Sequence, residues 1–235
     1  MAVNTRNSIV TNGLVLALDA GNTKSYTSGS TIWRNLTNPL VSGSLINGST
    51  FSNQNGGSIE FDGVNDYVTT NPEAKNLIQG QTNITIGITF QLDTIDVLRG
   101  LIGTLVYACG SNLGLVVSTG GSLQFYNDYG PAAGGTCYPV ALGNYVTTGI
   151  WINAVATYNG TTTTLYGIKN GILTKTTGTA KSGSTNIFSR DFEIMRGGSY
   201  YSDGRVANAF VYNRTLTEQE VLQNYNATKT RFGLS

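Results

Sequence analysis

Histidine is absent from the sequence, which removes the commonest general base in enzymes. Its absence also excludes Ser-His and Cys-His nucleophile pairs and histidine-ligated metal sites. Charged residues make up only 11% of the 235 positions, against about 25% in a typical globular protein. The 14 basic residues are scattered and nearly balanced by 13 acidic ones, so the sequence predicts no nucleic-acid surface.

Long apolar segments are missing as well. No stretch approaches the roughly 20 apolar residues that cross a bilayer, so we expect no membrane insertion. The first residues, MAVNTRNSIVTNG, contain one arginine and no apolar core, which is not the pattern of a signal peptide. We therefore expect synthesis in a cytosol, where Cys109 and Cys137 would stay reduced. Whether the two cysteines form a disulfide is left open, because the sequence does not show the geometry that a disulfide needs.

Short polar residues are frequent in this sequence, in place of charged ones. Thr, Ser, Asn and Gly suit strand surfaces and tight turns better than helices. Residues 1–12 lack periodicity and predict a flexible N-terminal arm. Residues 13–235 have the length of one sandwich domain. Within it, residues 22–57 show little regular pattern, and Trp33 and Leu36 are expected to plug one end of the core.

About a dozen β-strands are predicted along the domain. Residues 84–92 alternate strictly between apolar and small or polar side chains, and Asn-Gly pairs at 159–160 and 170–171 are strong hairpin signals. The expected strands are 14–18, 58–62, 67–70, 84–92, 101–107, 113–117, 123–126, 150–158, 162–168, 172–176, 192–195 and 206–212. Many strands with few helices favour a two-sheet antiparallel sandwich.

One short helix is predicted near the C-terminus. Thr217 with Glu220 three residues later has the form of a capping box. Leu216, Val221 and Tyr225 then follow at helical spacing, so the helix should pack one apolar face on the sandwich.

Four segments in this order resemble the laminin G-like jelly-roll group of the concanavalin A-like lectin/glucanase superfamily. They are GLVLALDAGN near the start, SIEFDGVNDYV at 58–68, WINAVATYNGTTTTLYGIKNG at 151–171 and GRVANAFVYNRTLTEQEVLQNY at 204–225. The resemblance spans residues 13 to 233. It implies an all-β, two-sheet antiparallel concanavalin A-like jelly-roll sandwich with one short C-terminal helix.

The opening and closing segments also resemble proteins of tailed bacteriophages of marine bacteria and cyanobacteria. That resemblance implies a virion protein made in the host cytoplasm, either a capsid decoration or a tail or fibre component. Its partners would be other virion proteins and further copies of itself, since virion positions repeat. The alternative is a receptor module that recognises a host surface glycan.

Catalysis has to be weighed, because the superfamily contains glycoside hydrolases. Such enzymes hold two carboxylates about 5–10 Å apart. Glu60 with Asp62, and Asp191 with Glu193, share strand faces, but neither pair continues into the Glu-x-Asp-x-(x)-Glu pattern of the glucanases. We therefore expect a non-catalytic protein in which these acids are solvated or cap turns.

Calcium is the ion that the family resemblance implies, held at a sandwich rim by carboxylates and carbonyls. Asp62, Asp66 and Asp203 are the candidate ligands, with Asp19 as an outlying fourth. The alternative is that Asp62 and Asp66 only form the FDGVND turn.

Sugar binding is the other activity that the resemblance implies, and exposed tyrosines beside Asn and Asp are its usual device. Two segments have this composition, and their candidate glycan-binding residues are Tyr126, Asn127, Asp128, Tyr129, Tyr200 and Tyr201. Packing between subunits would use the same tyrosines equally well.

Overall fold

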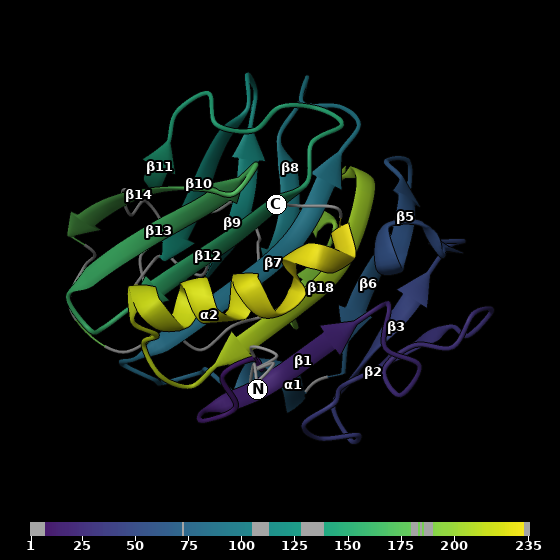
Figure 1. Ribbon diagram of the computed structural model, residues 1–235, viewed down its shortest axis with the longest axis horizontal. Coiled ribbons are helices and arrows are strands. Elements are labelled where there is room, and N and C mark those ends of the chain that lie inside the picture. Colours follow the sequence, from purple (N-terminus) through teal and green to yellow (C-terminus); the bar gives the residue numbers. More distant parts are fainter. Residues whose placement is uncertain are drawn as a thin grey trace, which may run out of the picture.

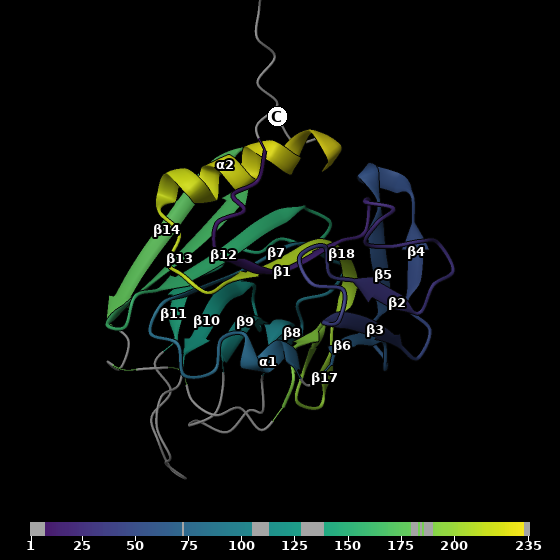
Figure 2. The same cartoon turned by 90° about the horizontal axis from the view of Figure 1, so that it is seen from below.

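Two antiparallel β-sheets packed face to face form the body of the protein (Figures 1 and 2). The computed structural model describes residues 8–71, 73–104, 113–127, 139–179, 183, 185 and 190–232. Cys109 and Cys137 lie outside these residues, as do Asp128 and Tyr129. The all-β sandwich with one main C-terminal helix is confirmed. None of the helices in the described ranges has the length and apolar character needed to cross a membrane.

Sheet A has the strand order β14-β13-β12-β7-β18-β5-β4, and β1 pairs with β18 beside this path. Its strands are β1 (Leu14–Asp19), β4 (Thr50–Ser52), β5 (Ser58–Asp62), β7 (Ile84–Leu92), β12 (Ile152–Tyr158), β13 (Thr162–Lys169), β14 (Ile172–Thr179) and β18 (Asp203–Tyr212).

Sheet B has the order β11-β10-β9-β8-β15-β6-β3-β2. Its strands are β2 (Ile32–Arg34), β3 (Ser42–Ile46), β6 (Tyr67–Thr70), β8 (Arg99–Gly103), β9 (Leu113–Ser118), β10 (Ser122–Asn127), β11 (Val140–Leu142) and β15 (Glu193–Ile194). A separate hairpin joins β16 (Arg196–Gly197) to β17 (Tyr200–Tyr201), and the short helices are η1 (Gln54–Gly56), α1 (Glu73–Asn76) and η2 (Lys229–Phe232).

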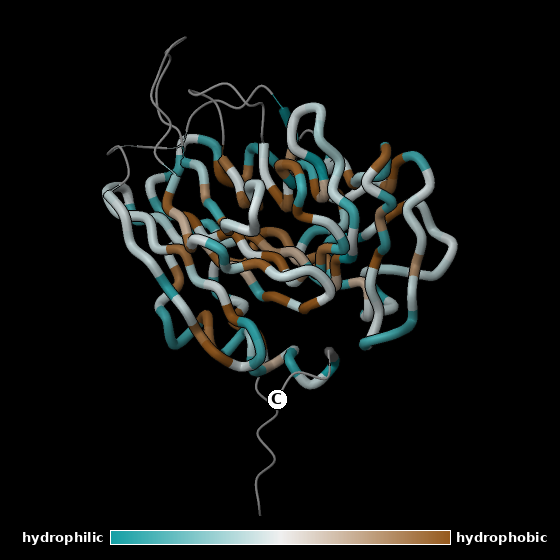
Figure 3. The backbone as a smooth tube through the Cα atoms, turned by 90° about the horizontal axis from the view of Figure 1, so that it is seen from above, coloured by the Kyte–Doolittle hydropathy of each residue, from teal (hydrophilic) through white to brown (hydrophobic). Residues whose placement is uncertain are grey.

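The core lies between the two sheets, where Figure 3 shows the hydrophobic segments gathered. On β7, the inward side chains from Ile84 to Leu92 are fully buried, as the period-two pattern predicts. Each such aliphatic or aromatic side chain stabilises the fold by roughly 1.5–3 kcal/mol. The outward position Gly87 has no side chain, and a Cβ there would lie 2.1 Å from the ring of Phe210 on the neighbouring strand.

The segment 22–57 is more regular than the sequence predicts. It contains β2, β3 and β4, which extend sheet B and sheet A at one end. Trp33 is fully buried as expected, but Leu36 is 39% exposed and plugs no core. Strands of only three to five residues leave no readable alternation, and their ladders depend on partners elsewhere in the chain.

Helix α2 (Glu218–Thr228) lies across the outer face of sheet A, away from sheet B (Figure 2). The capping box is confirmed, because the Thr217 side chain accepts from the Glu220 amide and the Glu220 carboxylate accepts from Thr217. The buried helix residues Val221 and Tyr225 pack with Tyr166 and Tyr212 of the sheet below.

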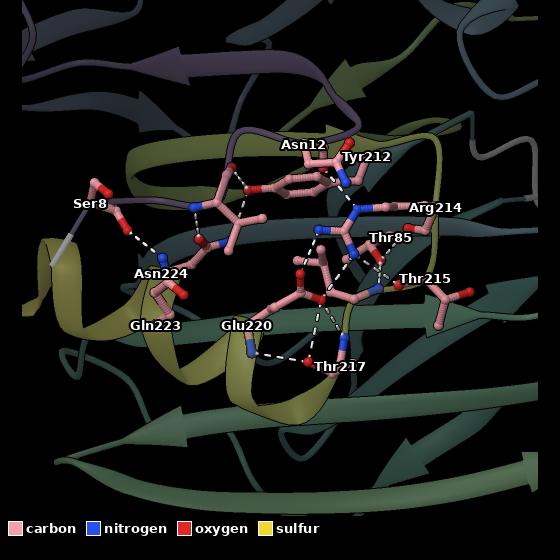
Figure 4. A network of polar contacts seen from close by, with 12 residues as sticks. Ser8, Asn12, Thr85, Tyr212, Arg214, Thr215, Thr217, Glu220, Gln223 and Asn224 are labelled. Carbon is pink, nitrogen blue, oxygen red and sulfur yellow. Dashed lines mark hydrogen bonds and ion pairs between the residues drawn. The ribbon is translucent and has the colours of Figure 1, made fainter.

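Residues 8–12, placed in the flexible arm by the sequence, dock between α2 and β18 (Figure 4). Val10 is buried, its amide donates to Asn224 Oδ1 at 2.8 Å, and its carbonyl accepts from the Tyr212 hydroxyl at 2.7 Å. Arg214 donates to the Asn12 carbonyl at 2.8 Å. Alternation is absent here because the segment is held by single polar contacts and not by a ladder.

Candidate binding site at the sandwich rim

The turn Gly63–Asp66 connects β5 of sheet A to β6 of sheet B and therefore lies on the rim of the sandwich. Asp62 Oδ1 accepts from the Val64 amide at 2.8 Å, which closes the turn as the sequence predicts. Gly63 has φ +73°, and a Cβ there would lie 2.7 Å from Cβ of Asp203. Glycine thus serves both the turn and the close approach of β18, whose Asp203 pairs with Asp62.

A polar hollow of about 330 Å³, which we call the acidic hollow, opens beside this turn. Strands β4, β5 and β18, the β3–β4 and β5–β6 turns, and the residue directly after β7 supply its lining, which includes Gly48, Thr50, Glu60, Asp62, Asp66, Asp93 and Arg205. Two predicted ligands, Asp62 and Asp66, therefore reach one hollow. The third, Asp203, lies opposite Asp62 in the β5–β18 ladder, and Asp19 is held elsewhere by Arg231 through two short hydrogen bonds.

Asp66 is the unusual member of the acidic hollow. Only 4% of the residue is exposed, and its Oδ1 atom has no hydrogen-bond partner. Burial raises the pKa of its carboxyl group, and the nearby charge of Asp62 raises it further. Burial likewise raises the pKa of Asp203, with Asp93 adding to the effect. A buried acceptor without a donor costs about 1–3 kcal/mol, which a ligand could recover.

Arg205 is the single basic residue in the lining of the acidic hollow. Its Nε donates to Glu60 Oε1 at 2.9 Å, and its Nη1 donates to Gln91 Oε1 at 2.7 Å. The guanidinium is therefore largely engaged, while the hollow keeps several carboxylates. The arrangement favours ligands that donate hydrogen bonds, such as hydroxyl groups, or a cation.

The calcium prediction can be compared with the oxygen atoms that the acidic hollow offers as ligands. Across the residues that the structure describes, no three His, Cys, Asp or Glu side chains are grouped closely enough to hold a metal ion. Yet the orphaned Oδ1 of Asp66 is the hard oxygen that Ca²⁺ prefers. A calcium ion here would take Asp66 and Asp62 as protein carboxylates and fill its shell with carbonyls, water or ligand hydroxyls. The calcium site stays a prediction.

The tyrosines predicted to bind glycan fall into two separate places. Tyr201 lies in the β16–β17 hairpin, with its ring centroid 6.0 Å from that of Tyr67, which follows Asp66. The Arg196 guanidinium lies over both rings, at 4.6 Å from Tyr67 and 5.3 Å from Tyr201. Tyr200 is 46% exposed. Tyr201 therefore lies near the turn that holds Asp66, and Tyr200 precedes it in the hairpin.

Tyr126 and Asn127 lie at the end of β10, which β9 and β8 separate from β15 and the hairpin. The Tyr126 hydroxyl donates to Gln124 at 3.1 Å, and Asn127 is buried. Their predicted neighbours Asp128 and Tyr129 lie outside the described residues. The structure therefore does not join the two predicted tyrosine clusters.

Asp93, Glu60 and Arg205 complete the acidic hollow without having been expected as ligands. The available signal for Asp93 is its position directly after the alternating stretch 84–92. Arg205 and Glu60 meet only because β18 pairs with β5, and a single sequence does not reveal strand pairing.

Comparison with known families settles what the fold is. The family model Laminin_G_3, described as the concanavalin A-like lectin/glucanases superfamily, matches residues 62–222. The chain belongs to this superfamily. The predicted concanavalin A-like jelly roll is thereby confirmed, and the FDGVND turn begins the matched region. A search of curated protein sequences found no match.

Solved structures with the same fold include sugar-processing and sugar-binding proteins. Trypanosoma rangeli sialidase matches with a TM-score of 0.63 and 19% identity, over 97% of this chain and 35% of the sialidase chain. The CBM40 domain of Ruminococcus gnavus IT-sialidase, bound to alpha2,3 sialyllactose, matches with a TM-score of 0.56 and 15% identity, over 70% of this chain and 94% of that domain. The chain thus spans about a third of the sialidase, and at these identities the likeness concerns the fold alone.

Proposed function

We propose that this protein is a non-catalytic glycan-binding module whose acidic hollow receives a sugar. The observation that carries the proposal is the buried, unpartnered Oδ1 of Asp66 in a hollow lined by further oxygen acceptors. Sugar hydroxyls are donors that would satisfy it, alone or together with Ca²⁺. The carbohydrate-binding domain among the structural neighbours supports this choice.

The state of the acidic pairs supports binding without cleavage. Glu60 is paired with Arg205, and Asp62 closes its own turn. Glu193 forms ion pairs with Arg196 at 3.2 Å and with Arg190 at 3.6 Å, so this buried carboxylate is also in use. A glycosidase needs one acid free to give a proton and a second free to attack or activate water. Structural partners hold Glu60, Asp62 and Glu193 instead.

A glycan array on the purified protein, with and without EDTA, tests the proposal. We expect binding by the wild type and a loss of at least about tenfold in affinity for Asp66→Asn, equal to 1.4 kcal/mol. Glu218→Gln is the matched control, because this exposed acid lies on α2 and does not line the hollow. Absence of binding to every glycan, or equal binding by both variants, contradicts the proposal. Release of reducing sugar from a bound glycan contradicts its non-catalytic part.

Display on a virion is the second function, favoured by the phage-like opening and closing segments. Neither the family match nor the structural neighbours tests it, so it stays a prediction. A capsid or tail position is compatible with glycan binding, since a displayed module can face a host surface. Labelled antibody on intact particles would show whether the protein is a virion component.

A further inference from the structure

A second hollow of about 270 Å³ lies next to the acidic hollow. The turn at residues 28–31 and the strands β3 and β4 line it, together with the rings of Tyr26 and Phe51. We call it the aromatic hollow. Gly48 and Thr50 line both hollows, so the two share one wall.

The shared wall is low. Gly48 has no side chain, and an ideal Cβ on it would find only Asp66 Oδ1 within contact range, at 3.6 Å. Thr50 is exposed on β4, and its hydroxyl lies 3.5 Å from Glu60 in the acidic hollow. A ligand in the acidic hollow could therefore extend over this wall without displacing a large side chain.

The aromatic hollow has the surface chemistry of a sugar subsite. The rings of Tyr26 and Phe51 lie 5.3 Å apart with a tilt of 32°. Tyr26 is buried, with 4% of the residue exposed, and Phe51 is half-buried. The Tyr26 hydroxyl donates to the Ser30 carbonyl at 2.9 Å, which fixes the ring in place. Serine and threonine residues line the same hollow, namely Ser28, Ser30, Thr31, Ser49 and Thr50. A preformed apolar wall beside hydroxyl groups matches the two kinds of surface on a pyranose.

The charge of the pair of hollows restricts the ligand further. Glu60, Asp62, Asp66 and Asp93 line the acidic hollow, and the single lining cation, Arg205, is already bonded to Glu60 and Gln91. Like charges in a partly desolvated site repel. A carboxylated sugar would meet this repulsion, whereas neutral hydroxyls would meet acceptors.

We infer that the two hollows bind consecutive units of one neutral oligosaccharide, the first at Asp66 and the second against Phe51. The inference rests on the proposed glycan binding and adds the length and charge of the glycan. It separates this protein from the CBM40 domain, whose structure holds sialyllactose.

Calorimetric titration, run once in EDTA and once in millimolar CaCl₂, tests the length and the charge of the glycan separately. The probes are glucose with maltose and maltotriose, N-acetylglucosamine with its dimer and trimer, and galactose with lactose and alpha2,3 sialyllactose. We expect at least about a tenfold gain in affinity from one unit to two in the best series, and lactose to bind better than sialyllactose. Equal affinity for one and two units, or a preference for sialyllactose, overturns the inference.

Two threonines in one loop provide matched variants. Thr31 is exposed and lines the aromatic hollow, while Thr27 is exposed and does not. Thr31→Trp should lower disaccharide affinity to the monosaccharide level and leave monosaccharide affinity unchanged, and Thr27→Trp should change neither. If Thr31→Trp keeps the disaccharide gain, the inference is wrong while glycan binding stands. If the wild type binds no probe in either buffer, the inference fails, and the proposed function fails with it only if the glycan array also shows no binding.

Discussion

At the scale of single residues, Asp66 is where binding and stability oppose each other. Burial and Asp62 raise the pKa of its carboxyl group. A group with a raised folded-state pKa stabilises the fold when protonated, and that contribution is lost as pH rises through the folded-state pKa. Once its carboxyl group is ionised, the folded protein therefore carries the cost of a buried charge, which a ligand could offset.

We predict that Asp66→Asn raises the free energy of unfolding at pH 7, by about 1 kcal/mol, because the amide removes the buried charge. The gain should shrink as pH falls through the raised folded-state pKa of Asp66 and should be gone below the usual range of an aspartate. Urea unfolding at pH 7 and pH 3 measures both values. Asp96→Asn is the control of opposite sign, since the hydrogen bond from Arg99 lowers the pKa of Asp96 and favours its charged form. A neutral-pH loss of stability in Asp66→Asn would contradict the prediction.

At the scale of elements, the docked N-terminal residues and α2 stabilise each other. Asn224 on α2 accepts from the Val10 amide and donates to the Tyr212 hydroxyl at 2.9 Å, and all three residues are buried (Figure 4). Arg214 and Glu220 form a second link beside them, and this arginine lowers the pKa of Glu220 to about 2. That pair stabilises the folded state above the ordinary glutamate range and is lost only as pH falls through about 2.

We predict that Asn224→Ala costs about 1–3 kcal/mol of unfolding free energy, because it leaves the Val10 amide without a partner inside the protein. Hydrogen exchange at Val10 should also become faster. Gln223→Ala is the matched control, since this exposed amide donates to the Ser8 carbonyl at 2.9 Å from the same helix. We expect its cost to stay within about 0.5 kcal/mol. Equal costs for the two variants would show that burial does not govern the contact.

Long elements could be predicted from the sequence, and short ones could not. The pattern of β7, the Asn-Gly hairpin between β12 and β13, and the cap of α2 are local signals, and the structure confirms each. Strands β2, β3, β4 and β11 have three to five residues, and their formation depends on tertiary partners. The docking of residues 8–12 could not be predicted for the same reason.

At the scale of the whole molecule, the acidic hollow exists only because distant strands are adjacent. Asp62 and Asp66 were predictable from one turn motif, but Glu60, Asp93 and Arg205 come together through the ladders that β18 forms with β5 and β7. The aromatic hollow likewise joins residues 26–31 to β4. A single sequence shows which residue types are available for a site. Which of them lie together depends on the order of the strands in the sheets, which the sequence does not show.

The calcium prediction is also best tested on the whole molecule. A ligand that binds only the folded state raises the unfolding midpoint in proportion to the logarithm of its concentration. We therefore expect millimolar CaCl₂, but not equal MgCl₂, to raise the thermal midpoint of the wild type, and Asp66→Asn to remove the effect. Differential scanning calorimetry after EDTA treatment provides the measurement. No shift with Ca²⁺ would remove calcium from the proposed site and leave direct glycan binding.

Strand β18 governs the order in which the protein can assemble during synthesis. It pairs with β1, β5 and β7, and the shortest of these separations joins Gly204 to Leu92. Strand β1 has no other sheet partner in the part of the chain described. A nascent chain therefore holds β1 unpaired and the edges of β5 and β7 open until the ribosome has released β18. Sheet A closes only after β18 has emerged from the ribosome, and slow, non-local pairing leaves these edges exposed to other nascent chains in the meantime.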